Sequence, residues 1–459
     1  MTIIVNTKLG EHRGKNRFWL EGEKLLQAGY TPGTKFDLEL NDRQILLHAS
    51  DEGKFTVSRR NRNGVIQPII DLKADELSQL FQTGELLRVA IRNGKIVISA
   101  HHQQARIRER IERLARKLAT GEPLSVCSLF HGGGVLDRAF HKGLSNAGVR
   151  SKIAVAVELE GQYLDSSLRN NPKLWDKNSI VIESPIQDVD LSKAPPEVDL
   201  CIAGLPCTGA SKAGRSKNKL EFAESHDEAG AMFFNFLQFV QKLNPSIVVI
   251  ENVPEYQGTA SMVVIRSVLQ SLGYKIQERI LDGNEFGALE DRKRLCAVAI
   301  SSDVDGFDLS KTESLRKKES RISEILEDVP QDSPRWKSFD YLAAKEARDK
   351  AAGKGFRRQL LTGDSESCGC IGRHYAKCRS TEPFLINPEI PSESRLFTPA
   401  EHCRIKAIPE QVISGLSDTI AHQILGQSIV FPVFEAVATS IGNSIVSWSN
   451  TQTLYSRAA

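Results

Sequence analysis

Between residues 123 and 301, short apolar segments alternate with amphipathic stretches, and this alternation limits the possible fold more than any other feature. Apolar strands that alternate with helices are typical of a doubly wound, mostly parallel sheet. The sequence therefore predicts an α/β fold here, with helices near residues 228–242 and 260–272. The expected strands are Leu124–Phe130, Lys152–Val157, Ser179–Ile182, Val198–Ala203, Ser246–Glu251, Tyr274–Leu281 and Leu295–Ile300.

The rest of the chain divides into further parts. Residues 1–100 contain short strands, turns and the two-residue hairpin signal Asn93-Gly94, which predict a β-rich N-terminal accessory domain. Residues 101–122 predict a basic helical connector to the α/β region. Residues 302–393 show poor periodicity, whereas residues 394–459 return to a helical pattern. A chain of 459 residues exceeds what one hydrophobic core holds, so several domains are expected.

Composition narrows the class of protein. The 40% hydrophobic and 25% charged residues are typical of a globular protein. No run reaches the roughly 20 apolar residues of a membrane helix, and no secretion signal is evident. Eight irregularly spaced cysteines fit reduced thiols, so a cytoplasmic protein without a membrane partner is expected. Cys368, Cys370, Cys378 and His374 lack the paired spacing of common zinc sites, and no metal is expected.

Positive charge gathers in two places, although the formal net charge is only +3. One cluster lies in residues 101–117 and the other in residues 350–379. Such clusters favour a polyanionic partner, nucleic acid first, but solvated helix faces and linkers explain either cluster equally well.

Glycines and a carboxylate follow the first two predicted strands. Gly132, Gly133 and Gly134 come directly after Phe130 and His131, and bare glycines let a ligand approach the backbone closely. A carboxylate at the end of the second strand can accept hydrogen bonds from a ribose diol, and Glu158 holds that position. Together these features favour a cofactor that contains a nucleoside, although each alone is weak evidence.

Cys207 lies on a Gly-Leu-Pro-Cys turn directly after the predicted strand Val198–Ala203. Ligands bind at the carboxyl ends of strands in such sheets, so this thiol is a candidate nucleophile, although a lone cysteine is more often a core residue. Glu251 ends the next strand, where a partly desolvated carboxyl group is a candidate acid or, alternatively, a cap or ion-pair partner. Arg292 and Arg294 bring positive charge to the same sheet edge.

In order and spacing, these pieces resemble the motifs of the DNA (cytosine-5)-methyltransferase family. The resemblance implies a Rossmann-like, S-adenosylmethionine-dependent methyltransferase sheet, a target-recognition region at residues 302–393 and a closing segment, residues 394–459, that completes the catalytic domain at residues 123–301. The matching segments are Phe130–Gly134, Gly204–Cys207, Glu251–Val253, Arg292–Arg294, Arg395–Glu401 and Gly426–Val430.

The resemblance implies methyl transfer from S-adenosylmethionine to carbon 5 of a cytosine that is flipped out of duplex DNA. Cys207 would add to carbon 6, and Glu251, Arg292 and Arg294 would hold the ring and its developing charge. It further implies a cognate restriction endonuclease as a partner, a monomer during catalysis and association with the nucleoid when the protein is on DNA. The implied cofactor contacts are Phe130, Gly132, Gly134, Glu158, Leu159, Gly204, Pro206, Gln427 and Ser428, and the implied DNA contacts are Ser211, Lys212, Arg215 and Lys217.

Several positions depart from the family pattern. Thr208 stands where glutamine usually follows the nucleophile, and Glu290 and Gln427 also replace common residues. Ser184 falls where an aspartate usually contacts adenine, so either Glu183 takes that role or the contact is missing. Two rivals stay open: an RNA cytosine-5 methyltransferase acting on transfer RNA, and a DNA-binding regulator on a weakened methyltransferase scaffold.

A second, weaker resemblance concerns the N-terminal region. The segments Leu25–Gly29 and Leu80–Gly84 each lead into paired strands, as in the duplicated swapped-hairpin fold of small DNA-binding regulators of the AbrB and SymE type. This resemblance implies that residues 1–100 bind DNA.

Overall fold

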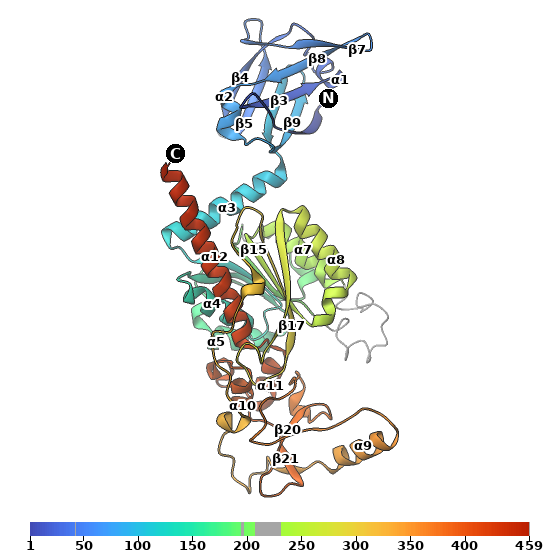
Figure 1. Cartoon of the computed structure of the whole chain (residues 1–459), viewed down its shortest axis with the longest axis vertical. Helices are drawn as coiled ribbons and strands as arrows, with labels where there is room; N and C mark the ends of the chain where they lie inside the picture. The colour runs from blue at the N-terminus through green and yellow to red at the C-terminus, as the bar shows by residue number, and fades with distance from the viewer. Residues whose placement is uncertain (42, 194–196, 207–230, 459) are drawn as a thin grey trace. The chain divides into compact units, whose positions relative to one another are not determined.

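The computed structural model describes residues 1–41, 43–193, 197–206 and 231–458. The chain forms two compact units, Met1–Glu109 and Arg110–Ala459, which are coloured along the chain in Figure 1. Helix α3 (His102–Thr120) contains the boundary between them, so the predicted connector is one continuous helix.

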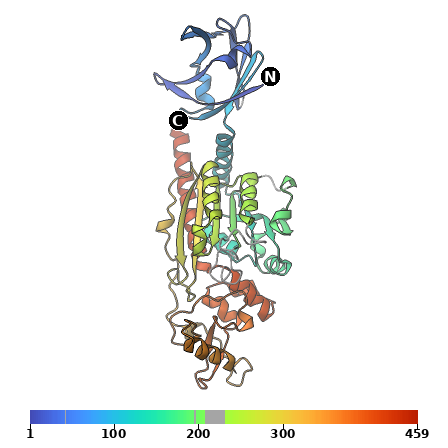
Figure 2. The same cartoon turned by 90° about the vertical axis from the view of Figure 1, so that its right-hand side faces the viewer.

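A seven-stranded sheet forms the centre of the second unit, in the order β13-β12-β11-β14-β15-β17-β16 (Figures 1 and 2). Neighbouring strands from β13 to β15 are parallel, and β17 is antiparallel to both its neighbours. The predicted mostly parallel α/β fold is confirmed, because every expected strand is present within two residues at each end. The strands are β11 (Leu124–Leu129), β12 (Ser151–Glu158), β13 (Ile180–Glu183), β14 (Leu200–Gly204), β15 (Ile247–Asn252), β16 (Tyr274–Asp282) and β17 (Lys293–Ser301).

The central strands of this sheet, β11, β14 and β15, are buried on both faces, which explains the continuous apolar runs in their sequences. In β14, Leu200 and Ile202 pack into one core with residues of α4, α11 and α12. Cys201 and Ala203 point to the other core, with residues of α7 and α8. The helices of this unit's α/β part are α4 (Val135–Asn146), α5 (Gly161–Asn170), α7 (Met232–Leu243), α8 (Ala260–Ser271), α11 (Asp418–Gln427) and α12 (Phe431–Ala458).

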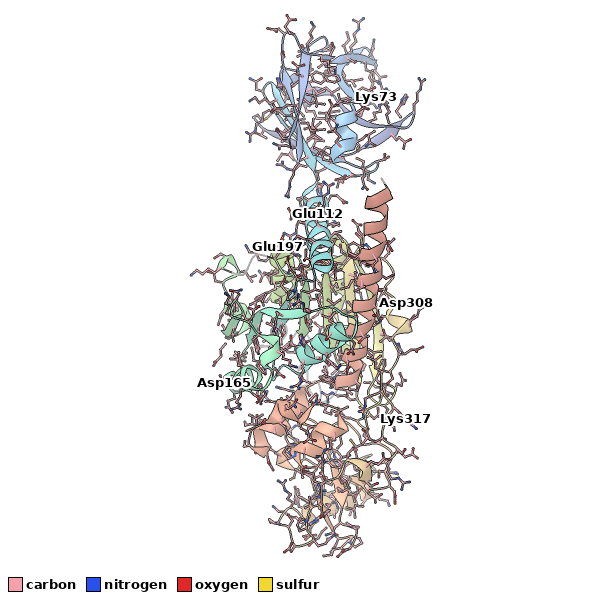
Figure 3. The ribbon with its side chains drawn as sticks, turned by 90° about the vertical axis from the view of Figure 1, so that its left-hand side faces the viewer. Lys73, Glu112, Asp165, Glu197, Asp308 and Lys317 are labelled. Carbon is pink, nitrogen blue, oxygen red and sulfur yellow. The ribbon has the colours of Figure 1, made fainter. Side chains whose placement is uncertain are left out.

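Basic side chains of α3 attach this helix to the sheet of the second unit. Arg113 donates to one oxygen of the fully buried Asp199 carboxylate (3.0 Å), and Lys117 donates to the other (2.6 Å). Arg113 also binds Glu197 (2.6 Å), which Figure 3 labels beside the helix. The Arg110 side chain is itself buried. These internal contacts use the charges of Arg110, Arg113 and Lys117, which are therefore not available to a polyanion, whereas Arg108 and Arg116 stay partly exposed.

The region with poor sequence periodicity contains a small sheet of its own, in the order β18-β21-β20-β19. A separate apolar core that includes Trp336, Tyr375, Leu385 and Phe397 lies beside it. The elements are β18 (Lys337–Ser338), α9 (Asp340–Ala351), β19 (Gln359–Leu361), β20 (Pro383–Ile386) and β21 (Glu393–Arg395).

The closing segment returns to the core of the second unit. Helix α10 (Pro399–Ile405) begins with a capping box, in which Thr398 and Glu401 bond reciprocally. Arg395 donates two hydrogen bonds to the buried Glu401 carboxylate (2.6 and 2.8 Å). Among the described residues no single helix is long and apolar enough to cross a membrane. Helices α11 and α12 are long and apolar enough only when they are taken together, and they are bent by 46° relative to each other.

Two buried histidines join α10 to α11. The Nδ1 atoms of His402 and His422 lie 3.0 Å apart, so one ring donates and the other accepts. The ring of Tyr375 packs edge-on against both. Burial lowers the pKa of His422 to about 4, although the charge of Asp418 raises it, and burial lowers the pKa of His402 well below its usual range.

This pair predicts acid sensitivity. The unfolded chain takes up a proton near pH 6.5, whereas folded His422 does so only near pH 4, so stability is complete above pH 6.5 and is lost as the pH falls toward 4. We expect the second unit to lose about 2 kcal/mol from His422 between pH 7.5 and 5 in urea unfolding. His422→Asn should flatten this dependence, whereas His102→Asn, at an exposed histidine, should not. An equal slope in both variants would contradict the assignment.

The N-terminal unit repeats one pattern, a short helix followed by a hairpin. Helix α1 (Glu23–Leu26) precedes β4 and β5, helix α2 (Asp75–Leu80) precedes β9 and β10, and β5 pairs with β10 at the centre of a six-stranded sheet. The predicted Asn93-Gly94 hairpin is confirmed by the β9–β10 register. The likeness to swapped-hairpin regulators stays a prediction. The strands are β1 (Ile3–Lys8), β2 (Gly10–His12), β3 (Lys15–Glu21), β4 (Lys35–Asn41), β5 (Gln44–Ala49), β6 (Phe55–Thr56), β7 (Ser58–Arg62), β8 (Val65–Leu72), β9 (Leu86–Arg92) and β10 (Lys95–Ala100).

Candidate active site

A cavity of about 770 Å³ lies at the carboxyl ends of β11, β12, β14 and β15. This volume is in the range of pockets that hold small organic ligands. The cavity brings together nearly all the described residues that the sequence singled out. Lining it are Phe130, Gly132, Glu158, Leu159, Gly204, Pro206, Glu251, Arg292, Arg294, Gln427 and Ser428. Outside the described residues lie Cys207, Thr208, Ser211, Lys212, Arg215 and Lys217.

Gly134 does not line the cavity but supports it from behind. Its φ is +74°, and a Cβ at this position would overlap the Ser167 hydroxyl and the His131 ring. His131 Nε2 lies 2.7 Å from that hydroxyl, inside a buried polar network that fixes the glycine loop. Phe130, at the start of the loop, has a φ of +59°. A left-handed aromatic residue is strained, and such strain gathers at functional sites.

The Glu158 carboxylate lies at the end of β12 and faces the glycine loop. Its Oε2 accepts from the Gly132 amide (2.7 Å) and its Oε1 accepts from the Glu160 amide (2.9 Å). Each carboxylate oxygen can accept a further hydrogen bond, so the group can hold two hydroxyls of a ribose. Leu159 is 59% exposed at the cavity, where it offers an apolar surface to a flat ring.

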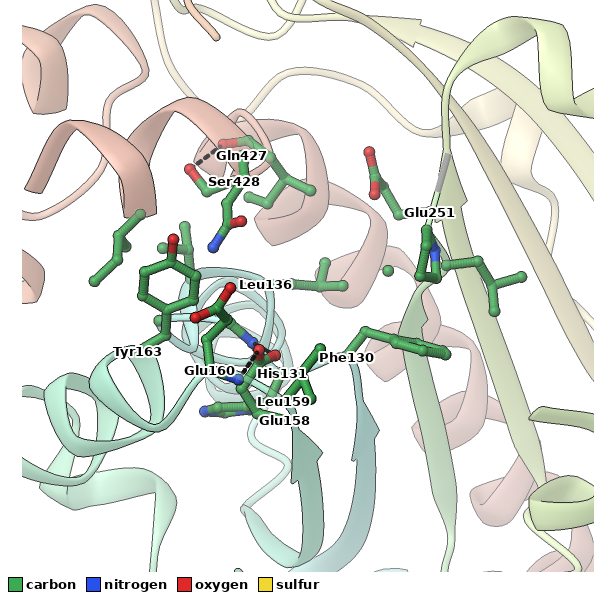
Figure 4. A pocket seen from close by; sticks show the side chains of 18 of the residues that line it. Phe130, His131, Leu136, Glu158, Leu159, Glu160, Tyr163, Glu251, Gln427 and Ser428 are labelled. Atoms are coloured by element: carbon green, nitrogen blue, oxygen red, sulfur yellow. Dashed lines mark hydrogen bonds between the residues drawn. The ribbon is translucent and has the colours of Figure 1, made fainter. Parts of the chain in front are cut away.

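The neighbouring wall is built by the end of β13 and by α11. Ser184 and Gln187 line the cavity, whereas Glu183 is not among the described lining residues and its carboxylate lies against Gly161. Glu183 is therefore not placed to substitute for the missing aspartate. Figure 4 shows Gln427 on the same side of the cavity as Glu158, with Glu251 on the opposite side.

Glu251 forms an ion pair with Arg294 across two antiparallel strands. Glu251 Oε1 lies 3.0 Å from Arg294 Nε, and both side chains are mostly buried. Gly204 pairs with Glu251 in the β14–β15 register, which puts the Gly-Leu-Pro turn beside this carboxylate. Asn252 is buried and donates to the Leu205 carbonyl (3.2 Å), which fixes the turn. The sequence included Asn252 in a motif but gave it no role.

Arg292 also lines the cavity, and its side chain belongs to a buried charged group. Its guanidinium donates to the Cys370 sulfur (2.8 Å) and lies 3.6 Å from the Glu290 carboxylate. The ammonium of Lys406 lies 3.5 Å from the same carboxylate and donates to the Ser428 carbonyl (3.0 Å). Burial and the charge of Arg292 lower the pKa of Lys406 to about 8, although the Glu290 charge raises it.

One loop of the small-sheet region, Cys368–Arg373, contacts this charged group and the cavity together. The Ile371 amide donates to Glu290 (2.7 Å), and a Cβ at Gly426 would overlap the Gly372 carbonyl. Arg373 lines the cavity and donates to Glu160 (2.8 Å). Sequence reasoning missed Arg373 as a site residue, because its partner lies far away along the chain.

A mostly parallel sheet with a glycine loop, a carboxylate at the end of the second strand and a charged pair at the fifth is typical of α/β enzymes that bind a nucleoside. Residues 124–443 match the family of C-5 cytosine-specific DNA methylases, and the chain belongs to this family.

Individual relatives support the same assignment. The Type II methyltransferase M1.ScrFI of Lactococcus lactis subsp. cremoris is 26% identical over 249 residues, which are 53% of this chain and 62% of that protein. The Type II methyltransferase M.NlaX of Neisseria lactamica is 29% identical over 252 residues, 53% of this chain and 75% of that protein. The match to M1.ScrFI thus spans less than two thirds of that protein. The S. pombe Dnmt2 methyltransferase has the same fold, with a TM-score of 0.55 at 20% identity over 69% of this chain and 98% of its own.

Proposed function

We propose that this protein transfers a methyl group from S-adenosylmethionine to carbon 5 of cytosine in duplex DNA, through a covalent bond between Cys207 and carbon 6 of the base. One observation carries the proposal. The Glu251–Arg294 pair and the Glu158 carboxylate line one cavity, and Pro206, which directly precedes Cys207 in the sequence, lines the same cavity.

The chain's own residues account for each step at the base. The Cys207 thiolate adds to carbon 6, which makes carbon 5 nucleophilic. Glu251 holds a proton at ring atom N3 and accepts from the exocyclic amine, while Arg294 fixes this carboxylate and opposes the charge that develops on the ring. Once carbon 5 carries the methyl group, loss of the carbon-5 proton to water expels the thiolate and restores the aromatic ring. Arg292 contacts Cys370 and Glu290, so its proposed role is to position this wall of the cavity.

The residues of the cavity fit S-adenosylmethionine. Its sulfonium supplies an electrophilic methyl group. Glu158 is proposed to bind the ribose hydroxyls, Leu159 and Phe130 to pack on the adenine, and Gln427 and Ser428 to bind the amino-acid end. Gly132, Gly134, Gly204 and Pro206 shape the backbone around it.

Glu158→Gln tests the cofactor assignment without a turnover assay. Its two oxygens both accept from backbone amides, so an amide NH₂ would put a donor against a donor and remove a charged acceptor. We expect S-adenosylhomocysteine to bind about 10- to 100-fold more weakly in calorimetry. Glu313→Gln, at an exposed glutamate, is the matched control. Unchanged affinity in Glu158→Gln would remove the ribose role.

The substrate class is tested by incorporation of a labelled methyl group. Incubation with random-sequence duplex DNA or with transfer RNA should label only the DNA, and bisulfite sequencing should place the label on cytosine carbon 5. Labelled RNA alone would favour the RNA methyltransferase. A third outcome would favour a DNA-binding regulator: neither DNA nor RNA is labelled, and Cys207→Ala binds duplex DNA as tightly as the wild type does.

The remaining assignments belong to the same proposal. Residues 302–393 are proposed to select the target sequence, and Lys212, Arg215, Lys217 and Ser211 to contact DNA phosphates and bases. Two relatives are named Type II methyltransferases, so a cognate endonuclease is the proposed partner. DNA from an expressing host should then resist cleavage at the methylated sequence.

A further inference from the structure

A two-stranded ribbon projects from the four-stranded sheet of the N-terminal unit. Strand β7 pairs with β8 along its whole length, so that Ser58 lies opposite Ile69 at one end and Arg62 lies opposite Val65 at the other. On its other edge β8 pairs with β3 only from Ile69 onward. Residues 58–68, called the ribbon below, therefore extend beyond the sheet at their tip, as Figure 1 shows for β7 and β8.

The ribbon has a buried root and a rigid, exposed tip. Ile69 and Ile70, just beyond it, are buried, whereas every residue of β7 is exposed. Asn63 and Gly64 form the turn with φ values of +52° and +82°. Positive φ at both positions is typical of a type I′ turn, which matches the natural twist of a hairpin. The tip is thus held in shape without a tertiary contact.

Charge on the ribbon has one sign. It carries Arg59, Arg60 and Arg62 and no acidic residue. Arg60 lies 3.4 Å from Glu21. Within the described part of the chain, no hydrogen bond or ion pair is found for Arg59 or Arg62. These two guanidinium groups are available to an anion.

Protection of an edge strand explains part of this pattern but not all of it. Charged side chains on an edge strand discourage pairing with another chain. Val65 and Ile66, however, are 59% and 54% exposed at the tip, next to the arginines. Two large aliphatic side chains on an exposed edge work against such protection, so the tip has the composition of a contact surface.

The side chains of the tip match the chemistry of a DNA groove. The major groove is about 12 Å wide and admits a two-stranded ribbon. Arginine binds guanine there, asparagine and glutamine bind adenine, and aliphatic groups contact the thymine methyl. The tip offers each type: two unpaired arginines, the exposed aliphatic pair and the amides Asn61, Asn63 and Gln67.

We propose that this ribbon inserts into the major groove of duplex DNA and forms a second DNA-binding site, separate from the methyl-transfer site. The proposal rests on the proposed function only for the choice of duplex DNA as the polyanion. Arg62 and Val65 lie on one face of the ribbon, and Arg59 and Ile66 lie on the other, because side chains alternate along each strand. Each face thus offers one arginine to phosphates and guanine edges and one aliphatic side chain to thymine methyl groups.

The full chain carrying Arg59→Gln and Arg62→Gln tests the proposal, with fluorescence anisotropy on a mixed-sequence DNA duplex over a series of KCl concentrations. We expect about tenfold weaker binding and a salt slope reduced by about 1.8, the value for two phosphate contacts. Lys35→Gln with Lys95→Gln removes the same charge from exposed positions on the other sheet of this unit. This control should bind within twofold of the wild type.

A second variant separates groove insertion from general attraction. Val65→Ser with Ile66→Ser should weaken DNA binding several-fold without a change in salt slope. Equal weakening by the arginine and lysine variants would show long-range attraction only and overturn the proposal. Equal weakening on duplex RNA, whose major groove is too narrow for side chains, would also overturn it.

Methylation kinetics keep the two proposals distinguishable. The arginine variant should raise KM for DNA and leave kcat unchanged at saturating DNA. If the wild type transfers no methyl group but the arginine variant still loses affinity, the proposed function fails and the ribbon site stands. If the wild type methylates DNA and the variant binds within twofold of it, the ribbon site fails.

Discussion

Replacing Glu251 by glutamine is expected to lower kcat for DNA methylation by about 10²- to 10³-fold. The carboxylate lies 3.0 Å from Arg294 and lines the cavity beside Pro206. Glutamine keeps the size of the side chain but cannot hold the proton at N3 or pair with the guanidinium. The measurement is single-turnover methyl transfer to duplex DNA, where binding and product release do not limit the rate.

Cofactor binding provides the internal control for this variant. Glu251 lies across the cavity from Glu158 (Figure 4), so S-adenosylhomocysteine should bind Glu251→Gln within about twofold of the wild type. Glu158→Gln should show the opposite pattern, with weaker cofactor binding and a kcat that recovers at saturating cofactor. If Glu251→Gln methylates at the wild-type rate, the acid role is wrong.

The second large effect concerns stability. Glu290, Lys406 and Arg292 are buried together, so the group has one negative and two positive charges. Glu290→Gln would leave both cations without this carboxylate, and removal of one partner from a buried pair costs about 3–5 kcal/mol. We expect that loss in urea unfolding of the second unit.

Lys406→Gln should behave differently from Glu290→Gln. It leaves Glu290 paired with Arg292, whose guanidinium lies 3.6 Å from the Glu290 carboxylate. The lowered pKa of Lys406 means that folding already penalises its charge. We therefore expect Lys406→Gln alone to change the free energy of unfolding by less than about 1 kcal/mol. In the double variant, Lys406→Gln should recover most of the stability that Glu290→Gln loses. Additive losses in the double variant would contradict the shared buried group.

These charges also connect the two parts of the second unit. The loop Cys368–Arg373 hydrogen-bonds to Glu290, to Arg292 of the cavity lining and to Glu160 of the same lining. One loop of the small-sheet region therefore holds residues on two walls of the cavity.

The sequence predicted the seven-stranded sheet well, because its central strands are apolar and buried on both faces. It also predicted which strand ends meet, since parallel strands bring their carboxyl ends to one edge. The short strand β13 was found because it lies within the alternating region, whereas the short strands β18 and β20 lie in a polar region without a periodic pattern and were missed. Side-chain partners far apart in the sequence were missed for another reason. The charge on α3 pairs with Asp199, and Arg373 pairs with Glu160, and neither pairing leaves a local signal.

The most direct test of the account uses duplex DNA that carries 5-fluorocytosine. Fluorine cannot leave carbon 5 as a proton does, so the bond between the cysteine sulfur and carbon 6 cannot be released after methyl transfer. With S-adenosylmethionine and a random-sequence pool of such duplexes, we predict a stable covalent protein–DNA adduct. Peptide mapping should identify Cys207 as the modified residue, and Cys207→Ser should form no adduct. An enzyme that methylates ordinary cytosine but forms no adduct, or forms one at another residue, would contradict the account.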